Sequence, residues 1–291
     1  MHILCEYTNM ESLLDGTYVI NMDKDVARLQ EFGNIMAASN WKFERQPAIN
    51  GKKLLGSWDE PMHPNEKVQL DAQMALKKKY VGGSLFLSKG EIGCMLSHMA
   101  LWEEVATNPE KNRIAIFEDD ARTHTDGDTI YRLLTGLYDY LHQNNIPEPD
   151  ILYLGKALDQ CMNYERVWNN VYKSTHPLCL HAYIITKQGA QKLIGMAPYS
   201  CPIDVVPIQG ISKGTITAMV FHPSIYFQDI FNNVSNLRQL AAGINTTTEC
   251  LVSMQHVAED TWEYLVVILI GLVALLILFT IFIWLRPWTL I

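Results

Sequence analysis

Three consecutive acidic residues, Glu118, Asp119 and Asp120, directly follow the apolar run RIAIF at residues 113–117. Such a run is typical of a buried β-strand, and three carboxylates at its end repel one another unless a positive charge neutralises them. If the chain stays extended, Glu118 and Asp120 project to one side and Asp119 to the other. Two carboxylates on one side of a cleft suit a hard divalent cation, Mg²⁺ or Mn²⁺, that bridges to a diphosphate. We call these residues the acidic cluster; the alternative is that they are only solvated carboxylates at a strand end.

Apolar and β-branched segments predict the strands of the domain that carries this cluster. They lie at residues 17–21, 41–50, 113–117, 150–155, 180–186 and 216–221. Segments with apolar residues at helical spacing separate them, at residues 26–36, 65–79, 88–107, 130–141 and 189–195. Strands that alternate with helices predict an α/β domain with a mostly parallel central sheet. Ligands bind at the carboxyl ends of strands in such sheets, which is where the acidic cluster lies.

The stretch before the third predicted helix contains one clear signal and one obscure region. The pattern Ser88-Lys-Gly-Glu91 predicts a capping box, in which each residue bonds the backbone amide of the other. Residues 52–87 are the least readable part of the chain and contain three consecutive lysines at 77–79 and a glycine pair at 82–83. A lysine run indicates a solvated face, and the glycine pair leaves open a hinge in a lid over a site.

The C-terminal region predicts a membrane anchor. Residues 265–284 contain neither a charge nor a proline, and a helix of about twenty residues spans roughly 30 Å, the thickness of a bilayer's hydrocarbon core. Trp262 and Trp288 flank the segment, as aromatic residues do at membrane interfaces. We therefore expect an N-terminal extension (1–16), a main domain (17–240), a short stem (241–263), a single transmembrane helix (264–285) and a short tail (286–291).

The termini and cysteines lead to an expectation about topology. The first sixteen residues lack the basic and apolar regions of a signal peptide. A tail-anchored protein with its main domain in the cytosol is therefore expected, although Arg286 weakly favours the opposite orientation. The six cysteines form no C-x-x-C pair, which excludes zinc-ribbon and thioredoxin-like sites. They fit free thiols in a reducing compartment, with a disulfide left open.

Composition excludes two broad classes of protein. The chain of 291 residues has a net charge of −8, and nucleic-acid binding depends on Lys and Arg side chains that neutralise phosphates. Nucleic acid is therefore not an expected partner. A hydrophobic content of 48% also excludes a wholly disordered chain.

Short blocks along residues 17–240 form an ordered pattern. They are YVINMD at 18–23 followed by Arg28, RQPAING at 45–51, LSKGEIGCMLSH at 87–98, IAIFEDD at 114–120, DILYLG at 150–155, AYIITKQGA at 182–190 and PID at 202–204. In this order the blocks resemble glycosyltransferase family 25, which includes lipopolysaccharide and collagen galactosyltransferases. The acidic block alone is a weak signal, whereas ordered blocks across the domain are specific. The predicted membrane anchor lies outside the resemblance.

The resemblance implies a GT-A-like fold, a Rossmann-like, mostly parallel sheet flanked by helices, and metal-assisted transfer from a UDP-sugar. Glu118 and Asp120 then stand where the family's DxD-like motif binds Mn²⁺ or Mg²⁺, a Lewis acid for the departing UDP. His222 is a candidate third metal ligand, since late histidines serve in this way in some GT-A enzymes. The residues expected to bind the nucleotide sugar are Asn21, Asp23, Arg28, Glu91, His98 and Asp119.

Several of these assignments have structural alternatives. Arg28 either contacts a phosphate or forms a salt bridge on a helix surface. Glu91 already has a role in the capping box, and His98 on an apolar helix fits a hydrogen-bonded core histidine. The family is generally inverting, which implies a general base for the acceptor hydroxyl. Asp204 is the candidate, with a helix N-cap or a salt-bridge partner as the alternative.

The resulting hypothesis is a membrane-anchored enzyme that transfers a hexose, most simply galactose from UDP-galactose, to a hydroxyl of a glycan, lipid-linked or protein acceptor. One rival is a catalytically inactive membrane protein that binds a sugar or nucleotide. Another is a metal-dependent nucleotidyltransferase or phosphohydrolase, which the lack of a glycine-rich phosphate loop disfavours. The sequence departs from the family pattern at Ala121 and across residues 52–87, which leaves acceptor binding unassigned.

Overall fold

The computed structural model describes residues 10–54, 64–82, 87–229 and 249–250, with backbone only for 64–68. Most of the predicted N-terminal extension and stem, and all of the predicted transmembrane helix and tail, lie outside the described residues. Within the described ranges, no helix combines the length and the apolar character that crossing a membrane requires. The predicted anchor at 264–285 therefore stays a prediction.

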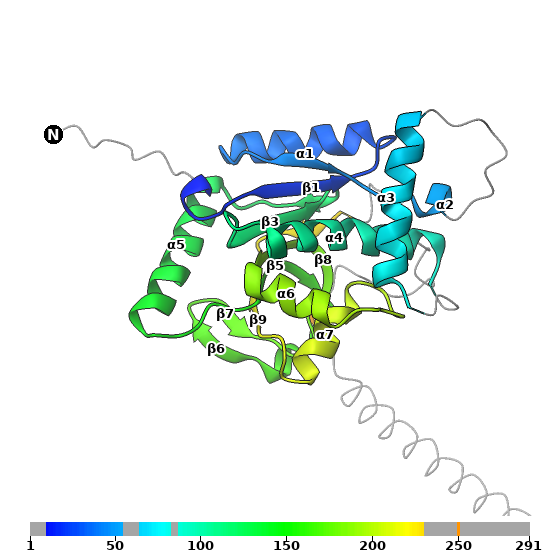
Figure 1. Cartoon of the computed structure of the whole chain (residues 1–291). Coiled ribbons are helices and arrows are strands. Elements are labelled where there is room, and N and C mark those ends of the chain that lie inside the picture. The colour runs from blue at the N-terminus through cyan, green and yellow to red at the C-terminus, as the bar shows by residue number, and fades with distance from the viewer. Residues whose placement is uncertain (1–9, 55–63, 83–86, 230–248, 251–291) are drawn as a thin grey trace, which may run out of the picture. The chain divides into compact units, whose positions relative to one another are not determined.

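An eight-stranded sheet forms the centre of the described domain (Figure 1). Across the sheet the strands are β2 (Glu44–Pro47), β1 (Thr17–Asn21), β3 (Arg113–Glu118), β8 (Leu178–Thr186), β5 (Ile151–Ala157), β9 (Ala218–Phe221), β7 (Val171–Lys173) and β6 (Glu165–Trp168). A separate antiparallel pair is formed by β4 (Ala121–Arg122) and β10 (Phe227–Gln228). Every strand predicted from the sequence is present, although β2 is shorter than residues 41–50.

The sheet is mixed, so the prediction of a mostly parallel sheet is confirmed only in part. β1 pairs in parallel with β2 and β3, and β5 with β9, but β8 runs antiparallel to both β3 and β5. The chain passes from β5 to β8 through the antiparallel β6–β7 hairpin and without the helical crossover that parallel neighbours need. β1, β3, β5 and β9 still point the same way, so their carboxyl ends share one edge of the sheet.

Helices cover both faces of the sheet and enclose two apolar cores. α1 (Val26–Ala38) and α5 (Gly127–Gln143) pack in one core, and α3 (Pro64–Tyr80), α4 (Lys89–Thr107), α6 (Lys187–Gly195) and α7 (Val205–Ser212) contribute to the other. The remaining helices are α2 (Gly51–Leu54) and the 3₁₀ turns η1 (Met10–Ser12) and η2 (Cys161–Asn163). β3 shows why the layers form: Ile114 and Ile116 face one core, whereas Ala115 and Phe117 face the other. This alternation confirms the predicted α/β fold.

Two of the sequence blocks meet where α4 begins. The capping box is present, because the Ser88 amide donates to Glu91 Oε2 at 2.6 Å and the Glu91 amide donates to Ser88 Oγ at 3.2 Å. A Cβ atom on Gly51 would lie 1.7 Å from the Lys89 carbonyl oxygen. Only glycine fits this contact, which fixes the start of α4 against the RQPAING block. α4 in turn carries His98 to the carboxyl end of β3.

A disulfide joins Cys161 to Cys250, 89 residues apart in sequence. The expectation of free thiols is therefore wrong for this pair. The alternative of a disulfide, which the sequence analysis left open, is correct here. Cys94, Cys179 and Cys201 are free among the described cysteines. Sequence spacing could not reveal the pair, because tertiary folding alone brings η2 and residue 250 together.

Candidate active site

The acidic cluster lies at a strand end that turns sharply. β3 ends at Glu118, and Asp119 and Asp120 form the turn that leads to β4. The alternation expected for an extended chain therefore fails after Glu118. As a result, Asp119 and Asp120 both contact Arg28, while Glu118 contacts His98 on α4.

Arg28 links two of the three carboxylates. Its Nη2 atom lies 2.5 Å from Asp119 Oδ1 and 3.0 Å from Asp120 Oδ2. The Arg28 side chain is 15% exposed, so this is a largely buried ion pair and the predicted surface salt bridge becomes an interior one. Asn21 Nδ2 donates to Asp119 at 2.6 Å, and Gln228 Nε2 donates to Asp120 at 3.1 Å. One carboxylate oxygen, Asp120 Oδ1, is buried without a hydrogen-bond partner.

Glu118 is held by a chain of buried hydrogen bonds. Trp102 Nε1 donates to the Tyr183 hydroxyl at 2.8 Å, which lies 2.9 Å from His98 Nδ1. His98 Nε2 lies 3.2 Å from Glu118 Oε1. If Tyr183 donates its proton to Nδ1, every group is satisfied and Nε2–H donates to Glu118. The reverse tautomer would turn a lone pair towards the carboxylate and leave the Tyr183 proton without these partners.

The surroundings change the acidity of all three carboxyl groups. Burial raises the pKa of Glu118, but the hydrogen bond and charge of His98, with His181 and Arg28, outweigh it and bring the pKa below its usual value. Burial outweighs Arg28 and raises the pKa of Asp119. Burial and the Glu118 charge raise the pKa of Asp120 to about 7. The acidic cluster therefore holds more negative charge than Arg28 balances. Asp120 also stays protonated to a higher pH than an exposed aspartate does.

Asp204 lies near the acidic cluster although 84 residues of sequence separate it from Asp120. It occupies the N-cap position of α7, but its side chain makes no capping bond. Burial raises its pKa and the Glu118 charge adds to this rise, whereas hydrogen bonds from the backbone amides of Asp204 and Val205 and the interaction with His98 oppose it. The capping alternative is therefore not realised. A carboxylate whose pKa moves towards neutrality suits a general base, which stays a prediction for Asp204.

Asn21 and Asp23 have different settings. Asn21 is buried and bonds Asp119, while its Oδ1 accepts from Arg45 Nε at 2.9 Å. Asp23 is exposed and pairs with Arg45 Nη2 at 2.5 Å. Asn21 thus positions Asp119, and Asp23 with Arg45 is the more accessible pair. The contacts of Arg45 with Asn21 and Asp23 were not predicted, although Arg45 opens the RQPAING block.

His222 occupies a separate charged group. Its Nδ1 lies 2.8 Å from Glu249 Oε2, which also lies 3.1 Å from Lys156 Nζ. We call Lys156, His222, Glu249 and the Cys161–Cys250 pair the disulfide cluster. β9, which precedes His222, is three strand positions from β3, or about 14 Å at ~4.8 Å per strand. The structure thus gives His222 partners other than the acidic cluster, and Glu91 likewise has its capping role.

The acidic cluster offers the type of donor that suits a hard divalent cation, although its three carboxylates do not all converge within 4.8 Å of one another. It offers carboxylate oxygens, which Mg²⁺ and Mn²⁺ prefer, and one of them, Asp120 Oδ1, is buried without a partner. Two other groups of potential ligands fit less well. Burial and neighbouring carboxylates raise the pKa of the Cys94 thiol beside His98 and Glu118, so this thiol stays protonated. The sulfurs of Cys161 and Cys250 beside His222 are already joined to each other.

Other residues at this edge have weak signals in the sequence or none. Gln228, which bonds Asp120, belongs to no recognisable block. His181 is fully buried on β8, burial lowers its pKa, and its Nδ1 has no hydrogen-bond partner. A Cβ on Gly155 would lie 2.2 Å from His181 Nε2, so the glycine of the DILYLG block makes room for this ring. In the sequence, a role for His181 is indicated only by its position directly before the AYIITKQGA block.

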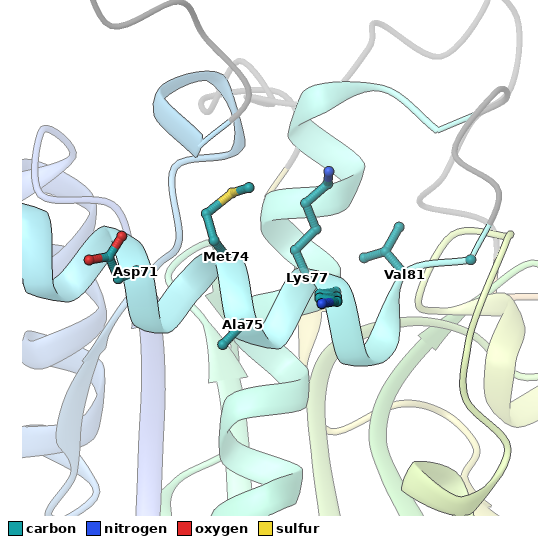
Figure 2. A pocket seen from close by; sticks show the side chains of 7 residues that line it. Asp71, Met74, Ala75, Lys77 and Val81 are labelled. Atoms are coloured by element: carbon teal, nitrogen blue, oxygen red, sulfur yellow. The ribbon is translucent and has the colours of Figure 1, made fainter.

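A surface hollow of about 630 Å³ lies along α3 and shares no residue with the acidic cluster (Figure 2). It is lined by Asp71, Met74, Ala75, Lys77, Lys78, Val81 and Gly82. Lys78 and Lys79 are exposed, as expected for the lysine run. The Gly82 amide donates to the Tyr199 carbonyl at 2.6 Å, which ties down this end of the glycine pair. Gly83 lies outside the described residues, so the hinge stays a prediction.

Comparison with known proteins identifies the family. The profile of "Glycosyltransferase family 25 (LPS biosynthesis protein)" matches residues 15–206. The chain belongs to glycosyltransferase family 25. The match contains the acidic cluster, Arg28, His98 and Asp204, so the structure gathers at one sheet edge residues that the family domain provides. The predicted glycosyltransferase is thus confirmed at the level of the family.

Relatives within family 25 include proteins named as active and as inactive. Human procollagen galactosyltransferase 2 is 31% identical over 195 residues, which cover 65% of this chain and 29% of the human protein. A bovine protein, "Probable inactive glycosyltransferase 25 family member 3", is 26% identical over 190 residues, which cover 63% of this chain and 29% of that protein. The chain thus spans less than a third of the length of these curated relatives.

A solved structure provides a weaker comparison. Galactosyltransferase LgtC, in complex with donor and acceptor sugar analogues, matches with a TM-score of 0.35 and 11% identity over 70% of this chain and 72% of that one. Such a low TM-score carries no weight for the fold. Membership of family 25 therefore depends on the sequence match alone.

Proposed function

We propose that this family 25 protein has a GT-A-like fold and transfers a hexose, most simply galactose from UDP-galactose, to a hydroxyl group. The acceptor would be a glycan, a lipid-linked sugar or a protein. The observation that carries the proposal is the acidic cluster at the carboxyl edge of the sheet, with excess negative charge and the unpartnered, buried Asp120 Oδ1. A soluble nucleotide sugar is an anion, so binding it beside these carboxylates requires a cation.

In this proposal, the acidic cluster holds Mn²⁺ or Mg²⁺, which would stabilise the charge that develops on the departing diphosphate. Asn21 holds the Asp119 carboxylate, and His98 directs its Nε2–H to Glu118. These two side chains therefore position ligand oxygens, although they were predicted to contact the donor. Such support from outside the ligand shell commonly changes metal affinity by about 10- to 100-fold.

Asp204 is proposed to accept the proton of the acceptor hydroxyl. Inversion at the anomeric carbon requires a base opposite the departing UDP. Burial raises the pKa of Asp204 and so increases its basicity relative to an exposed carboxylate. Asp204 precedes α7, so it comes from a different element than the residues proposed to hold the metal.

The location of the protein is a further part of the proposal. We propose that residues 264–285 anchor it in a membrane, as their composition predicts. The Cys161–Cys250 disulfide favours a main domain in an oxidising compartment, which is opposite to the cytosolic orientation expected from the termini. Protease protection of intact membranes, with mass spectrometry under non-reducing conditions, tests both points. A protected, disulfide-linked domain supports the oxidising side, and a digested domain with free thiols contradicts it.

Turnover is tested by UDP release from the purified full chain across a panel of UDP-sugars, with and without Mn²⁺. The proposal expects release with one hexose donor that depends on Mn²⁺ and increases with a hydroxyl acceptor. Donor-independent phosphate release would instead indicate a phosphohydrolase. Absence of release with every donor and acceptor class would contradict the transferase proposal.

The alternative of an inactive binding protein has one specific observation in its favour. Arg28 already pairs with two of the carboxylates that a metal would need. If this pair is permanent, the protein would bind UDP without help from Mn²⁺ and would release none from a UDP-sugar. Calorimetric titration with UDP, with and without Mn²⁺, separates this alternative from the transferase.

A further inference from the structure

Arg28 bridges the acidic cluster through a single atom. Its Nη2 nitrogen contacts Asp119 Oδ1 at 2.5 Å and Asp120 Oδ2 at 3.0 Å. A cation that binds both aspartates through these two oxygens would take the position of Nη2. The guanidinium and a divalent cation cannot share that position, because both are positive and both require the carboxylates as partners.

We propose that Arg28 is a displaceable placeholder for the metal: it neutralises Asp119 and Asp120 in the metal-free protein, and metal entry releases it to bind the diphosphate of the donor. This inference deepens the proposed function and depends on it. It assigns to one side chain two successive partners, first the carboxylates and then the phosphates, and it makes metal and nucleotide binding mutually dependent.

The contacts of Arg28 are consistent with a temporary partner. Its Nε is buried without a hydrogen-bond partner, and so is Asp120 Oδ1 on the other side of the pair. A permanent buried ion pair normally satisfies its remaining donors and acceptors, since leaving them unpaired is unfavourable. The unpaired Asp120 oxygen thus gives an incoming cation its first ligand before Arg28 leaves.

The place of Arg28 on α1 supports its second role. It lies in the first turn of the helix Val26–Ala38, where the helix dipole disfavours a cation and favours an anion. The carboxylates offset this unfavourable position in the metal-free protein. Once released, the guanidinium stays beside a helix terminus that favours phosphate, and its planar group of donors suits phosphate oxygens.

Direct titration of the purified full chain with Mn²⁺, followed by calorimetry and by electron paramagnetic resonance of free Mn²⁺, tests the first step without turnover. Without nucleotide, Arg28→Gln should bind Mn²⁺ about tenfold more tightly than wild type, because the competing cation is gone. Arg45→Gln is the matched control: it removes a positive charge that contacts Asn21 and Asp23 but neither cluster aspartate. Its affinity for Mn²⁺ should stay within about twofold of wild type.

Titration with UDP tests the second step. In wild type, saturating Mn²⁺ should strengthen UDP binding through two contributions, the metal itself and the released Arg28. In Arg28→Gln, the strengthening should be smaller by about tenfold, because only the metal contributes. Arg28→Met, which keeps the apolar stem, provides the same test if the glutamine variant does not fold.

The outcomes separate this inference from the proposed function. Unchanged or weaker Mn²⁺ binding by both Arg28 variants, with UDP-dependent Mn²⁺ binding intact in wild type, overturns the placeholder and leaves the transferase proposal standing. Equal tightening in Arg45→Gln also overturns it, since the effect would then be general electrostatics. If wild type binds no Mn²⁺ even with UDP, both the metal site and the placeholder are overturned.

Discussion

The acidic cluster and the disulfide cluster lie at the same edge of the sheet but differ in how their charges are balanced. In the disulfide cluster, Lys156 is completely buried and pairs with Glu249, whose other carboxylate oxygen accepts from the Ser224 amide at 2.9 Å. In the acidic cluster, Asp119 and Asp120 share one guanidinium, Glu118 bonds His98, and one buried Asp120 oxygen has no partner. A balanced buried group stabilises the fold, whereas an unbalanced one with an open acceptor indicates a ligand site.

The two clusters also differ in how the chain builds them. The acidic cluster combines the end of one strand with Arg28 from the neighbouring α1 and His98 from α4. The disulfide cluster draws Glu249 from far along the chain, and the adjacent Cys250 is covalently linked to η2. The first arrangement leaves side chains able to exchange partners, and the second fixes them. The comparison predicts that changes to the first cluster alter function and changes to the second alter stability.

The largest expected effect is loss of activity on replacement of Asp120. Asp120→Asn removes one proposed metal ligand while keeping the shape of the side chain. Metal-dependent UDP release should fall by at least about 100-fold, beyond the ~10- to 100-fold typical of supporting residues. Asp126→Asn is the control, because Asp126 is an exposed N-cap of α5 and asparagine also caps helices well. A rate for Asp120→Asn within tenfold of wild type would remove the acidic cluster from the mechanism.

The next effect concerns stability and the disulfide cluster. The double variant Cys161→Ser, Cys250→Ser opens a covalent loop of 89 residues, which should lower the free energy of unfolding by about 2–4 kcal/mol. Denaturant unfolding measures this loss, with Cys201→Ser as the control for an unpaired thiol. At a temperature where the double variant is folded, its rate of UDP release should stay close to that of wild type. A loss of rate comparable to that of Asp120→Asn would show that the two clusters do not divide function and stability.

A smaller effect is expected from the hydrogen-bond chain behind Glu118. Tyr183→Phe leaves Trp102 Nε1 and His98 Nδ1 without their partner, which should lower stability by about 1–3 kcal/mol and Mn²⁺ affinity by about tenfold. Tyr153→Phe is a matched control: Tyr153 is the sheet neighbour of Tyr183, equally buried, and its hydroxyl has no hydrogen-bond partner. ¹⁵N NMR of the His98 ring should report a proton on Nε2 in wild type. A proton on Nδ1 alone would contradict this tautomer.

The smallest effect is a pH dependence of stability. The pKa of Asp120 is raised to about 7. The stabilising effect of this shift on the folded protein is therefore complete below the unfolded-state pKa of about 4, and it is lost as the pH rises from there towards 7. Asp120→Asn should therefore gain stability relative to wild type between pH 5 and pH 8, by on the order of 1 kcal/mol. Melting temperatures at the two pH values measure this gain. Hydrogen bonds from Thr129 lower the pKa of Asp126, so Asp126 is ionised at both pH values. Asp126→Asn should therefore differ from wild type in stability by the same amount at pH 5 and at pH 8.

Much of the fold could be read from local patterns. The alternation of residues 113–117, the helical spacing of the apolar residues in α5 and the Ser88–Glu91 capping box all gave correct elements, because their signals lie within a few residues. The direction of β8 could not be read in this way. Its pairing depends on the β6–β7 hairpin, and the short, partly polar strands of that hairpin carry little periodic signal.

The sequence by itself determined the family, the α/β class and the identity of the acidic cluster, because ordered blocks and hydrophobic periods are properties of the linear chain. Only the tertiary structure decided which residues neutralise one another. It placed Arg28 between Asp119 and Asp120, His98 behind Glu118, and His222 with Glu249 instead of with the acidic cluster. Charge pairing depends on distance in space and on burial, and both arise only when segments far apart in sequence pack together.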